Sequence, residues 1–271
     1  MRIFLFSYLL FFSIHSMAAC QFKKHVTKVF SLSGVTSVAL KEMGLLKNPA
    51  VKGISVFNPI GKTDFTGKRY PGGIFLSPGV FKEFGGGVVL YDESRELSSI
   101  LDPMSSIQGI QVKTRGLIPV AVTEYVLKEL EPFLQDCEKE KTSFLAKTYL
   151  TADRLSKTIP ENRTAVYYLG RNRKGQHPEM IMVHDGIVKW LIEQKKIKSY
   201  PSSLAYVNWS AKLMRKLPKD TLHINVIDSG AEMTKKLEGK FGQWTLTYPG
   251  ALVPGLTQLE AWGYFEDAAS P

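Results

Sequence analysis

The hydrophobic residues of this chain fall into short runs that alternate with amphipathic segments. Between the runs, apolar positions recur with the helical period of about 3.6 residues, as at 36–46 and 186–195. Runs typical of buried strands lie at 29–33, 51–57, 88–91 and 110–112, and again at 165–169, 180–183, 222–227 and 244–247. Strands that alternate with helices indicate a mostly parallel sheet in each half of the chain.

Weaker patterns predict the remaining elements. Residues 58–73 are rich in Gly, Pro, Thr and Lys, which indicates a loop, and three glycines from Gly85 to Gly87 end a short helix at 80–84. The segment 95–104 is expected to be helical or looped. A short strand is expected at 205–207, and helices are expected at 210–216, 231–238 and 256–264.

A longer helical period separates the two halves. It runs over 122–155, and Pro132 is its only interior breaker, so we expect a kink there or two successive helices. The second piece, 138–157, would span roughly 30 Å and suits a rigid connector. The fold class is therefore α/β, with two Rossmann-like lobes joined by one long helix. The expected parts are an N-terminal lobe at 20–135, a connector at 136–158 and a C-terminal lobe at 159–271.

The N-terminal residues 1–19 resemble a secretory signal peptide. Arg2 precedes an apolar run from Ile3 to Ile14, and Met17-Ala18-Ala19 supplies the small residues that a signal peptidase needs. The run is too short for a permanent membrane helix, and no later stretch approaches eighteen uncharged apolar residues. These features predict export to the periplasm.

Two cysteines remain after such cleavage, Cys20 and Cys137. In an oxidising compartment they are able to pair and close a loop of over a hundred residues. Residues 17–20 also resemble the lipobox of bacterial lipoproteins, in which Cys20 would carry a lipid anchor. A third interpretation is two unpaired thiols.

Charge and motifs narrow the function. The net charge of +10 favours an anionic ligand or membrane surface, whereas the chain has no nucleic-acid-reading motif, so no nucleic-acid partner is expected. Nucleophile-elbow, phosphate-loop and dinucleotide fingerprints are absent from the sequence. The histidines lack the spacing of a zinc site. We therefore expect a binding protein without enzymatic activity, cofactor or dedicated metal site.

Candidate ligand residues follow the predicted strands or lie at loop tips. Ligands of parallel α/β sheets gather beyond the carboxyl ends of the strands. Aromatic rings and arginines at such ends suit a large conjugated ligand that carries negative charge. The predicted ligand-binding residues are Ser33, Tyr91, Arg95, Arg115, Arg171, Arg173, Trp209 and Tyr248.

The order of elements resembles the periplasmic binding proteins for vitamin B12, haem and ferric siderophores. The opening Lys28-Val29-Phe30-Ser31-Leu32-Ser33-Gly34, the strand at 109–112, and Val166-Tyr167-Tyr168-Leu169-Gly170 followed by His184-Asp185-Gly186 occur in the family's order. The resemblance covers nearly the whole mature chain through loose motifs. It implies two α/β lobes, a ligand in the cleft between them, and an inner-membrane ABC permease as partner. The family usually docks its permease through one glutamate per lobe, but those positions fall near Pro78 and Ala211 here.

The expected function is capture of a metal chelate or corrinoid. The arginines favour a ferric siderophore over vitamin B12 or haem. Two alternatives stay open: a sensing or scaffolding protein that keeps the fold without transport, and an exported hydrolase.

Overall fold

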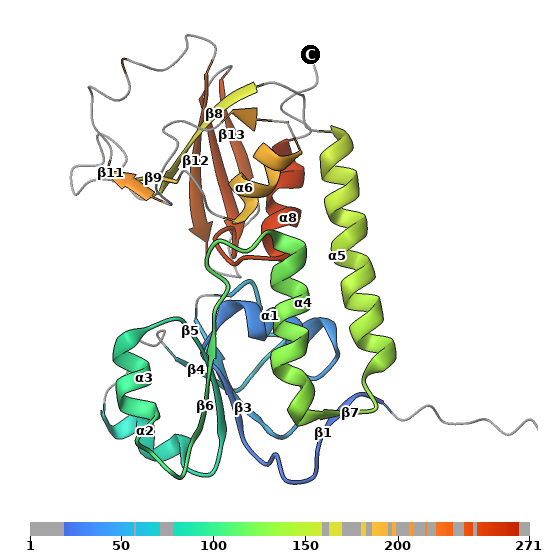
Figure 1. Cartoon of the computed structure of the whole chain (residues 1–271), viewed down its shortest axis with the longest axis vertical. Coiled ribbons are helices and arrows are strands. Elements are labelled where there is room, and N and C mark those ends of the chain that lie inside the picture. Colours follow the sequence, from blue (N-terminus) through green and yellow to red (C-terminus); the bar gives the residue numbers. More distant parts are fainter. Residues whose placement is uncertain are drawn as a thin grey trace, which may run out of the picture.

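Two β-sheets, one in each half of the chain, organise the computed structural model (Figure 1). The structure describes residues 19–56, 58–70, 78–158, 163–169, 180–182, 186–194, 197–198, 206–208, 215, 221–229, 236–240 and 243–265. The predicted signal peptide lies almost wholly outside these residues. No described helix is long and apolar enough to cross a membrane.

The first sheet is entirely parallel, in the order β4-β3-β2-β5-β6. Its strands are β2 (Val29–Ser31), β3 (Val51–Ser55), β4 (Lys68–Tyr70), β5 (Val88–Asp92) and β6 (Gln108–Val112). The loop prediction for 58–73 is wrong at β4. Because β4 is a three-residue edge strand that pairs with β3 alone, it lacks the apolar run of a central strand.

Helices cover both faces of this sheet. They are α1 (Gly34–Glu42) and α4 (Pro119–Leu130) on one face, and α2 (Pro78–Phe84) and α3 (Arg95–Leu101) on the other (Figure 1). Successive strand residues point to opposite faces, so Leu90 packs in the core under α1 and α4, whereas Val89 and Tyr91 pack under α2 and α3. Burial on both faces explains the continuous apolar runs.

The second sheet has the order β11-β9-β8-β12-β14-β13, and β10 (Ile197–Lys198) pairs with β8. Its other strands are β8 (Arg163–Leu169), β9 (Met180–Met182), β11 (Tyr206–Asn208), β12 (Leu222–Ser229), β13 (Lys236–Lys240) and β14 (Gln243–Pro249). Strands β8, β12 and β14 are parallel, whereas β9 and β13 run antiparallel to their neighbours. The mostly parallel α/β class is therefore confirmed.

The helix predicted at 231–238 is wrong over its last three residues, which belong to β13. Leu237 pairs with Leu246 of β14, so the segment is placed by its partner strand. Its alternation of polar and apolar residues is too short to separate helix from strand. The helix predicted at 210–216 lies outside the described residues except for Arg215, which is in a turn.

Pro132 separates two successive helices, as the sequence predicts. It lies in the 3-10 helix η2 (Glu131–Phe133), after which β7 (Leu134–Gln135) pairs with β1 (Gln21–Phe22) and α5 (Glu138–Thr158) begins. A disulfide joins Cys20 to Cys137 beside these strands. A sulfur in a disulfide is not available for a thioether-linked lipid, so the structure has the first of the three states expected for Cys20.

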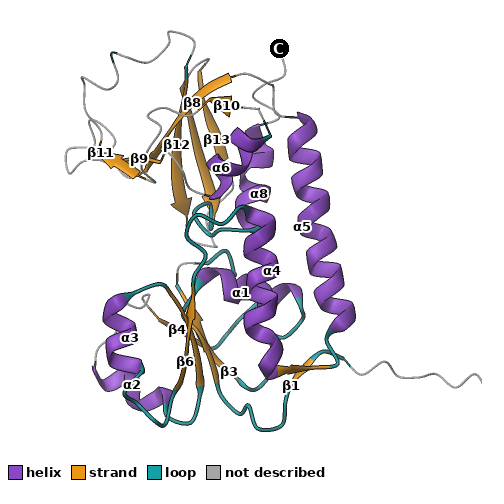
Figure 2. Ribbon diagram, viewed as in Figure 1, coloured by secondary structure: helices purple, strands orange, loops and turns teal. Residues whose placement is uncertain are grey.

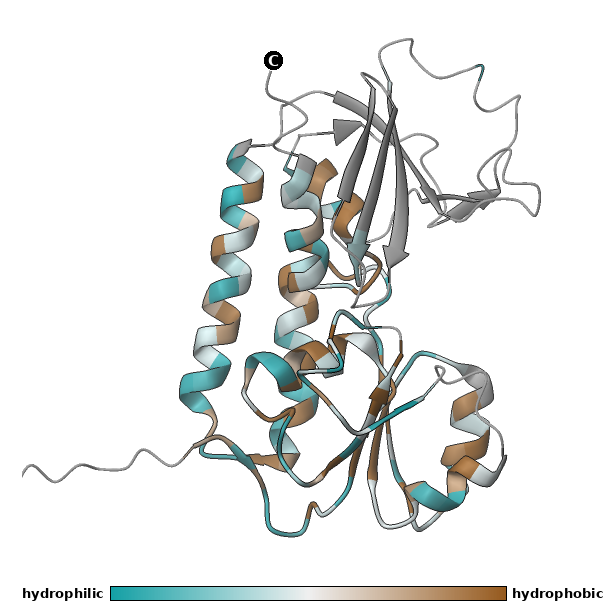
Figure 3. Ribbon diagram, turned by 180° about the vertical axis from the view of Figure 1, so that it is seen from behind, coloured by the Kyte–Doolittle hydropathy of each residue, from teal (hydrophilic) through white to brown (hydrophobic). Residues whose placement is uncertain are grey.

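Helix α5 runs along both lobes beside α4 and α8 (Leu256–Trp262) (Figure 2). Hydrophobic and hydrophilic residues alternate along it (Figure 3). Phe144 packs in the core of the first lobe, whereas Ala152 and Leu155 pack in the core of the second. Between them the buried hydroxyls of Thr148 and Thr123 lie 3.3 Å apart. One face of α5 therefore contributes to the cores of both lobes.

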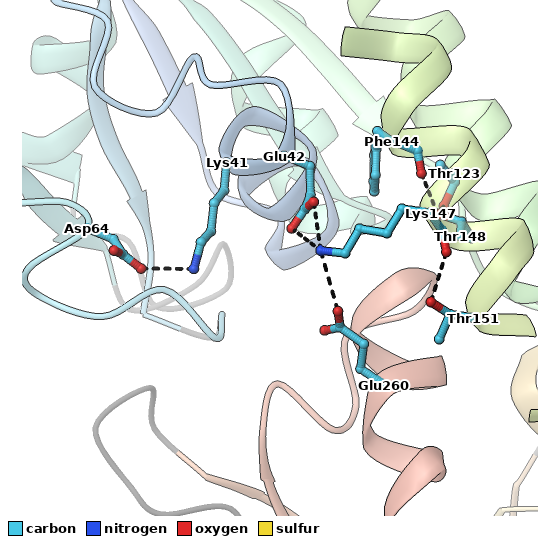
Figure 4. Close-up of polar contacts among 9 residues, drawn as sticks. All are labelled: Lys41, Glu42, Asp64, Thr123, Phe144, Lys147, Thr148, Thr151 and Glu260. Atoms are coloured by element: carbon cyan, nitrogen blue, oxygen red, sulfur yellow. Dashed lines mark hydrogen bonds and ion pairs between the residues drawn. The ribbon is translucent and has the colours of Figure 1, made fainter. Parts of the chain in front are cut away.

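An ion-pair cluster joins the lobes on the flank of α5 (Figure 4). The Lys147 ammonium lies 2.8 Å from Glu42 of α1 and 3.5 Å from Glu260 of α8. Partial burial disfavours the charged ammonium, but the hydrogen bonds and charges of the two glutamates outweigh this and raise the pKa of Lys147 above its ordinary value of 10.5. The cluster therefore holds α1 and α8 to the same point of α5.

Replacing Lys147 with Met is expected to lower the free energy of unfolding by about 1 kcal/mol or less, because the ion pairs are partly exposed. A lysine whose pKa is raised in the folded protein contributes its full stabilisation at pH values below the ordinary pKa of 10.5. That contribution is lost as the pH rises through the raised pKa. Urea titrations should therefore show that the difference in free energy of unfolding between wild type and Lys147→Met becomes smaller above about pH 10.5. Lys139→Met, on the exposed surface of the same helix, is the control. A difference in free energy of unfolding that increases with pH would contradict a stabilising role of these ion pairs.

Candidate functional site

The carboxyl ends of the parallel strands in the two sheets point toward each other (Figure 2). The turn after β14 meets the loop after β3, since a Cβ atom added to Gly250 would lie 2.9 Å from Pro59 Cδ. We call the described residues at and after the ends of these strands the facing edges: 31–33, 55–56, 58–60, 92–94 and 113–115 of the first lobe, and 248–255 of the second. This is where ligands of parallel α/β sheets bind.

Buried hydroxyls fix the turn from β2 into α1. The Ser31 hydroxyl lies 2.5 Å from the Thr36 hydroxyl and 2.8 Å from that of Ser37. Ser37 donates to the Ser33 carbonyl at 2.9 Å, and Ser33 itself is fully buried at the N-cap of α1. Ser33, a predicted ligand residue, is thus part of a rigid turn beneath the surface.

Asp92 ends β5 at the same edge, and the sequence analysis did not select it. The residue keeps exposed surface, whereas the protein around its carboxyl group excludes much of the solvent from that group. This exclusion of solvent raises the pKa of the carboxyl group, while the nearby Ser33 hydroxyl lowers it in part. A carboxylate directly after a buried strand was the signal that could have identified it. The edge of the first lobe, where arginines are predicted, therefore also carries a carboxyl group.

The arginines are only partly described. Arg115 is exposed in the turn after β6, where Gly116 adopts a φ of 74°. Arg95 is the first residue of α3, whose N-terminus the Ser94 hydroxyl caps by accepting from the Leu97 backbone. Its side chain is not described. Arg171, Arg173 and Trp209 lie outside the described residues, so their predicted role stays a prediction.

The two predicted tyrosines are core residues. Tyr91 is 2% exposed, and its hydroxyl lies 3.2 Å from that of Ser98. Tyr248 is 3% exposed and packs edge-on against Tyr264, with ring centroids 5.3 Å apart. Both residues are the last but one of their strands, and their side chains pack in the cores and do not extend beyond the strand end. This burial leaves neither ring much surface for a ligand, and we do not carry them into the proposed site.

The described residues hold no cluster of three or more His, Cys, Asp or Glu side chains able to bind a metal ion. Polar groups at the facing edges of the first lobe are instead largely engaged within the protein. Asn58, for example, donates to the Ser55 carbonyl and accepts from the Ile60 backbone at 2.8 Å. Side chains that remain exposed at these edges include Asp92, Lys113 and Arg115.

No protein-family model and no curated protein sequence matches the chain. Solved structures do match it. The periplasmic haem-binding protein HutB of Vibrio cholerae is 13% identical, with a TM-score of 0.66, and the match covers 91% of this chain and 100% of HutB. The haem-binding protein RhuT from Roseiflexus sp. RS-1 is also 13% identical, with a TM-score of 0.64 over 90% of this chain and 97% of RhuT.

A third match is a possible iron-binding, periplasmic solute-binding protein from Staphylococcus epidermidis. It is 16% identical, with a TM-score of 0.62, and the match covers 92% of this chain and all of the other. These similarities confirm the fold that the sequence resemblance implies: two α/β lobes and a long helix, as in periplasmic binding proteins.

Proposed function

We propose that this chain is a periplasmic solute-binding protein that captures a metal chelate for an ABC-type importer. The observation that carries the proposal is the meeting of two sets of parallel-strand carboxyl ends along one connecting helix. Such edges are where α/β sheets bind ligands. The fold that the chain shares with haem- and iron-binding proteins supports the same class of ligand.

The ligand we expect from the arginines is a ferric siderophore, with vitamin B12 and haem as the next candidates. Purification from the native periplasm, followed by a visible spectrum and a mass spectrum of any bound molecule, tests the proposal. An absorbing metal chelate at one equivalent per chain is the expected result. A preparation that carries none and binds none of the three classes on titration would contradict it.

The double variant Arg171→Ala/Arg173→Ala is expected to weaken binding of the chelate by roughly a hundredfold. Each charge-assisted contact typically contributes about 1.5–3 kcal/mol, and about 1.4 kcal/mol corresponds to a factor of ten. Fluorescence or calorimetric titration measures the change. Lys24→Ala/Lys52→Ala removes the same charge from exposed positions away from the facing edges and should bind as wild type. Equal losses in both variants would show a general charge effect.

The glutamates through which the family usually docks its permease have no counterpart at the matching positions of this chain. Pro78, near the usual docking position, begins α2 and has no charge. Glu83 of the same helix is already engaged, because Lys68 Nζ lies 2.5 Å from it and the Tyr70 hydroxyl donates to it at 2.9 Å. Ala211 lies outside the described residues. This engagement of Glu83 favours a second candidate function, a sensing protein that binds the chelate without delivering it.

Co-purification with membrane proteins separates these two functions. An importer subunit retained by the chelate-loaded protein, and lost in Glu83→Gln, would support delivery through that side chain. Retention of a non-transporter membrane protein would support sensing.

A further inference from the structure

Two large apolar side chains are exposed at the facing edges, one from each lobe. Val56 directly follows β3 and is 40% exposed, and Leu252 lies in the turn after β14 and is 38% exposed. The other large hydrophobic residues exposed among the described residues lie on α3 and α5: Ile100, Tyr149 and Leu150. The exposure of Val56 and Leu252 at the facing edges therefore requires a separate explanation.

The backbone fixes both residues in place. The Val56 backbone donates to the Tyr70 carbonyl at 2.8 Å, and its predecessors Ile54 and Ser55 are fully buried. Leu252 occupies the tip of a turn that the Val253 backbone closes by donating to Gly250 at 2.8 Å. Its neighbours Ala251 and Val253 are buried, so the turn is anchored on both sides of the exposed leucine.

The two residues flank one contact between the lobes. Gly250, two residues before Leu252, packs against Pro59, three residues after Val56, so closely that an added Cβ would lie 2.9 Å from the proline ring. Turn tips normally carry polar residues, and an apolar side chain at such a position costs solvation without contributing to the core. A partner that covers both residues would recover this cost.

We infer that Val56 and Leu252 form an apolar contact for the ligand, and that the ligand is a metal chelate with a hydrophobic organic frame. This inference rests on the proposed function and specifies its substrate class. It alters the order of ligands expected from the arginines, because a chelate that is hydrophilic all round would leave both side chains uncovered. The exposed Arg115 at the same set of edges supplies the charge for an anionic group on such a frame.

Iron protoporphyrin IX and ferric citrate are the probes that test the inference. Wild-type protein should bind the porphyrin at least tenfold more tightly than the citrate complex. Val56→Thr, which keeps the β-branched shape, and Leu252→Asn, which suits a turn, should each weaken porphyrin binding about tenfold, and together about a hundredfold. Binding of ferric citrate should not change.

Ile100→Thr and Leu150→Gln are the controls, because they remove exposed apolar side chains elsewhere and correct for non-specific adsorption of the porphyrin; Ile100 is as exposed as Val56, at 40%, and Leu150 is more exposed, at 69%. Thermal unfolding confirms that each variant is folded. The inference would be overturned if ferric citrate bound more tightly than the porphyrin, or if the double variant bound the porphyrin with unchanged affinity. Either result would leave the proposed function standing. Binding of neither probe would overturn the inference, and titration with vitamin B12 and ferric siderophores would then decide the proposed function separately.

Discussion

Reduction of the Cys20–Cys137 disulfide should lower the free energy of unfolding by about 5 kcal/mol. The two cysteines are 117 residues apart, and a cross-link over such a loop restricts the unfolded chain strongly. The bond also holds β1 against β7 at the point where α5 begins. Urea titrations with and without a phosphine reductant measure the difference.

The variant Cys20→Ser/Cys137→Ser separates the bond from other effects of the reductant. Its unfolding midpoint should equal that of the reduced wild type and should not respond to reductant. A difference below about 1 kcal/mol between oxidised and reduced protein would contradict the expectation, as would a lipid adduct on Cys20 in the native protein.

Replacing Gly186 with Ala should destabilise the protein by about 3 kcal/mol or more. Gly186 begins α6 (Gly186–Glu193) in the second lobe and packs directly on the first. An added Cβ would lie 2.0 Å from the Leu117 carbonyl oxygen and 3.1 Å from its carbon. Because the clash is with backbone, no side-chain rotation relieves it, and the lobes must shift apart. Chemical denaturation measures the loss, and chelate affinity should fall with it.

Gly79→Ala is the matched control for this change. Gly79 lies within α2, and an added Cβ there would meet nothing within 4 Å. Alanine is the better helix former, so Gly79→Ala should be neutral or stabilise by up to about 1 kcal/mol. A Gly186→Ala protein as stable as this control would show that the lobes do not pack as described.

The sequence predicted the central strands well because they are buried on both faces. Runs such as Val88 to Tyr91 contain no charged residue and are typical of strands that are buried on both faces. The helical period with its single proline predicted both the break at Pro132 and the extent of α5. The edge strands β4 and β13 were missed for the opposite reason. The segments that became β4 and β13 are short, polar and paired on one side only, so their structure depends on a neighbour that the local pattern does not contain.

The candidate site was harder to predict, because the end of a strand does not reveal where a side chain points. Ser33 and Tyr91 lie near strand ends as expected, yet both are buried. Ser33 lies in the turn of buried hydroxyls, and Tyr91 packs on the sheet face that α2 and α3 cover. Asp92, Val56 and Leu252 are exposed at the same edges without any motif. The exposure of a side chain at a strand end depends on the packing around it in three dimensions, which sequence patterns do not encode.

The position of the disulfide implies an order of events for the export that the N-terminal residues predict. A chain that is threaded across a membrane from its N-terminus presents Cys20 first, and Cys137 follows only after 117 more residues. During that interval the first thiol is available to any other reactant, including a lipid-transferring enzyme. On the export that residues 1–19 predict, the disulfide that ties the start of the connector helix to the N-terminal strand forms only if Cys20 is still unmodified when Cys137 emerges.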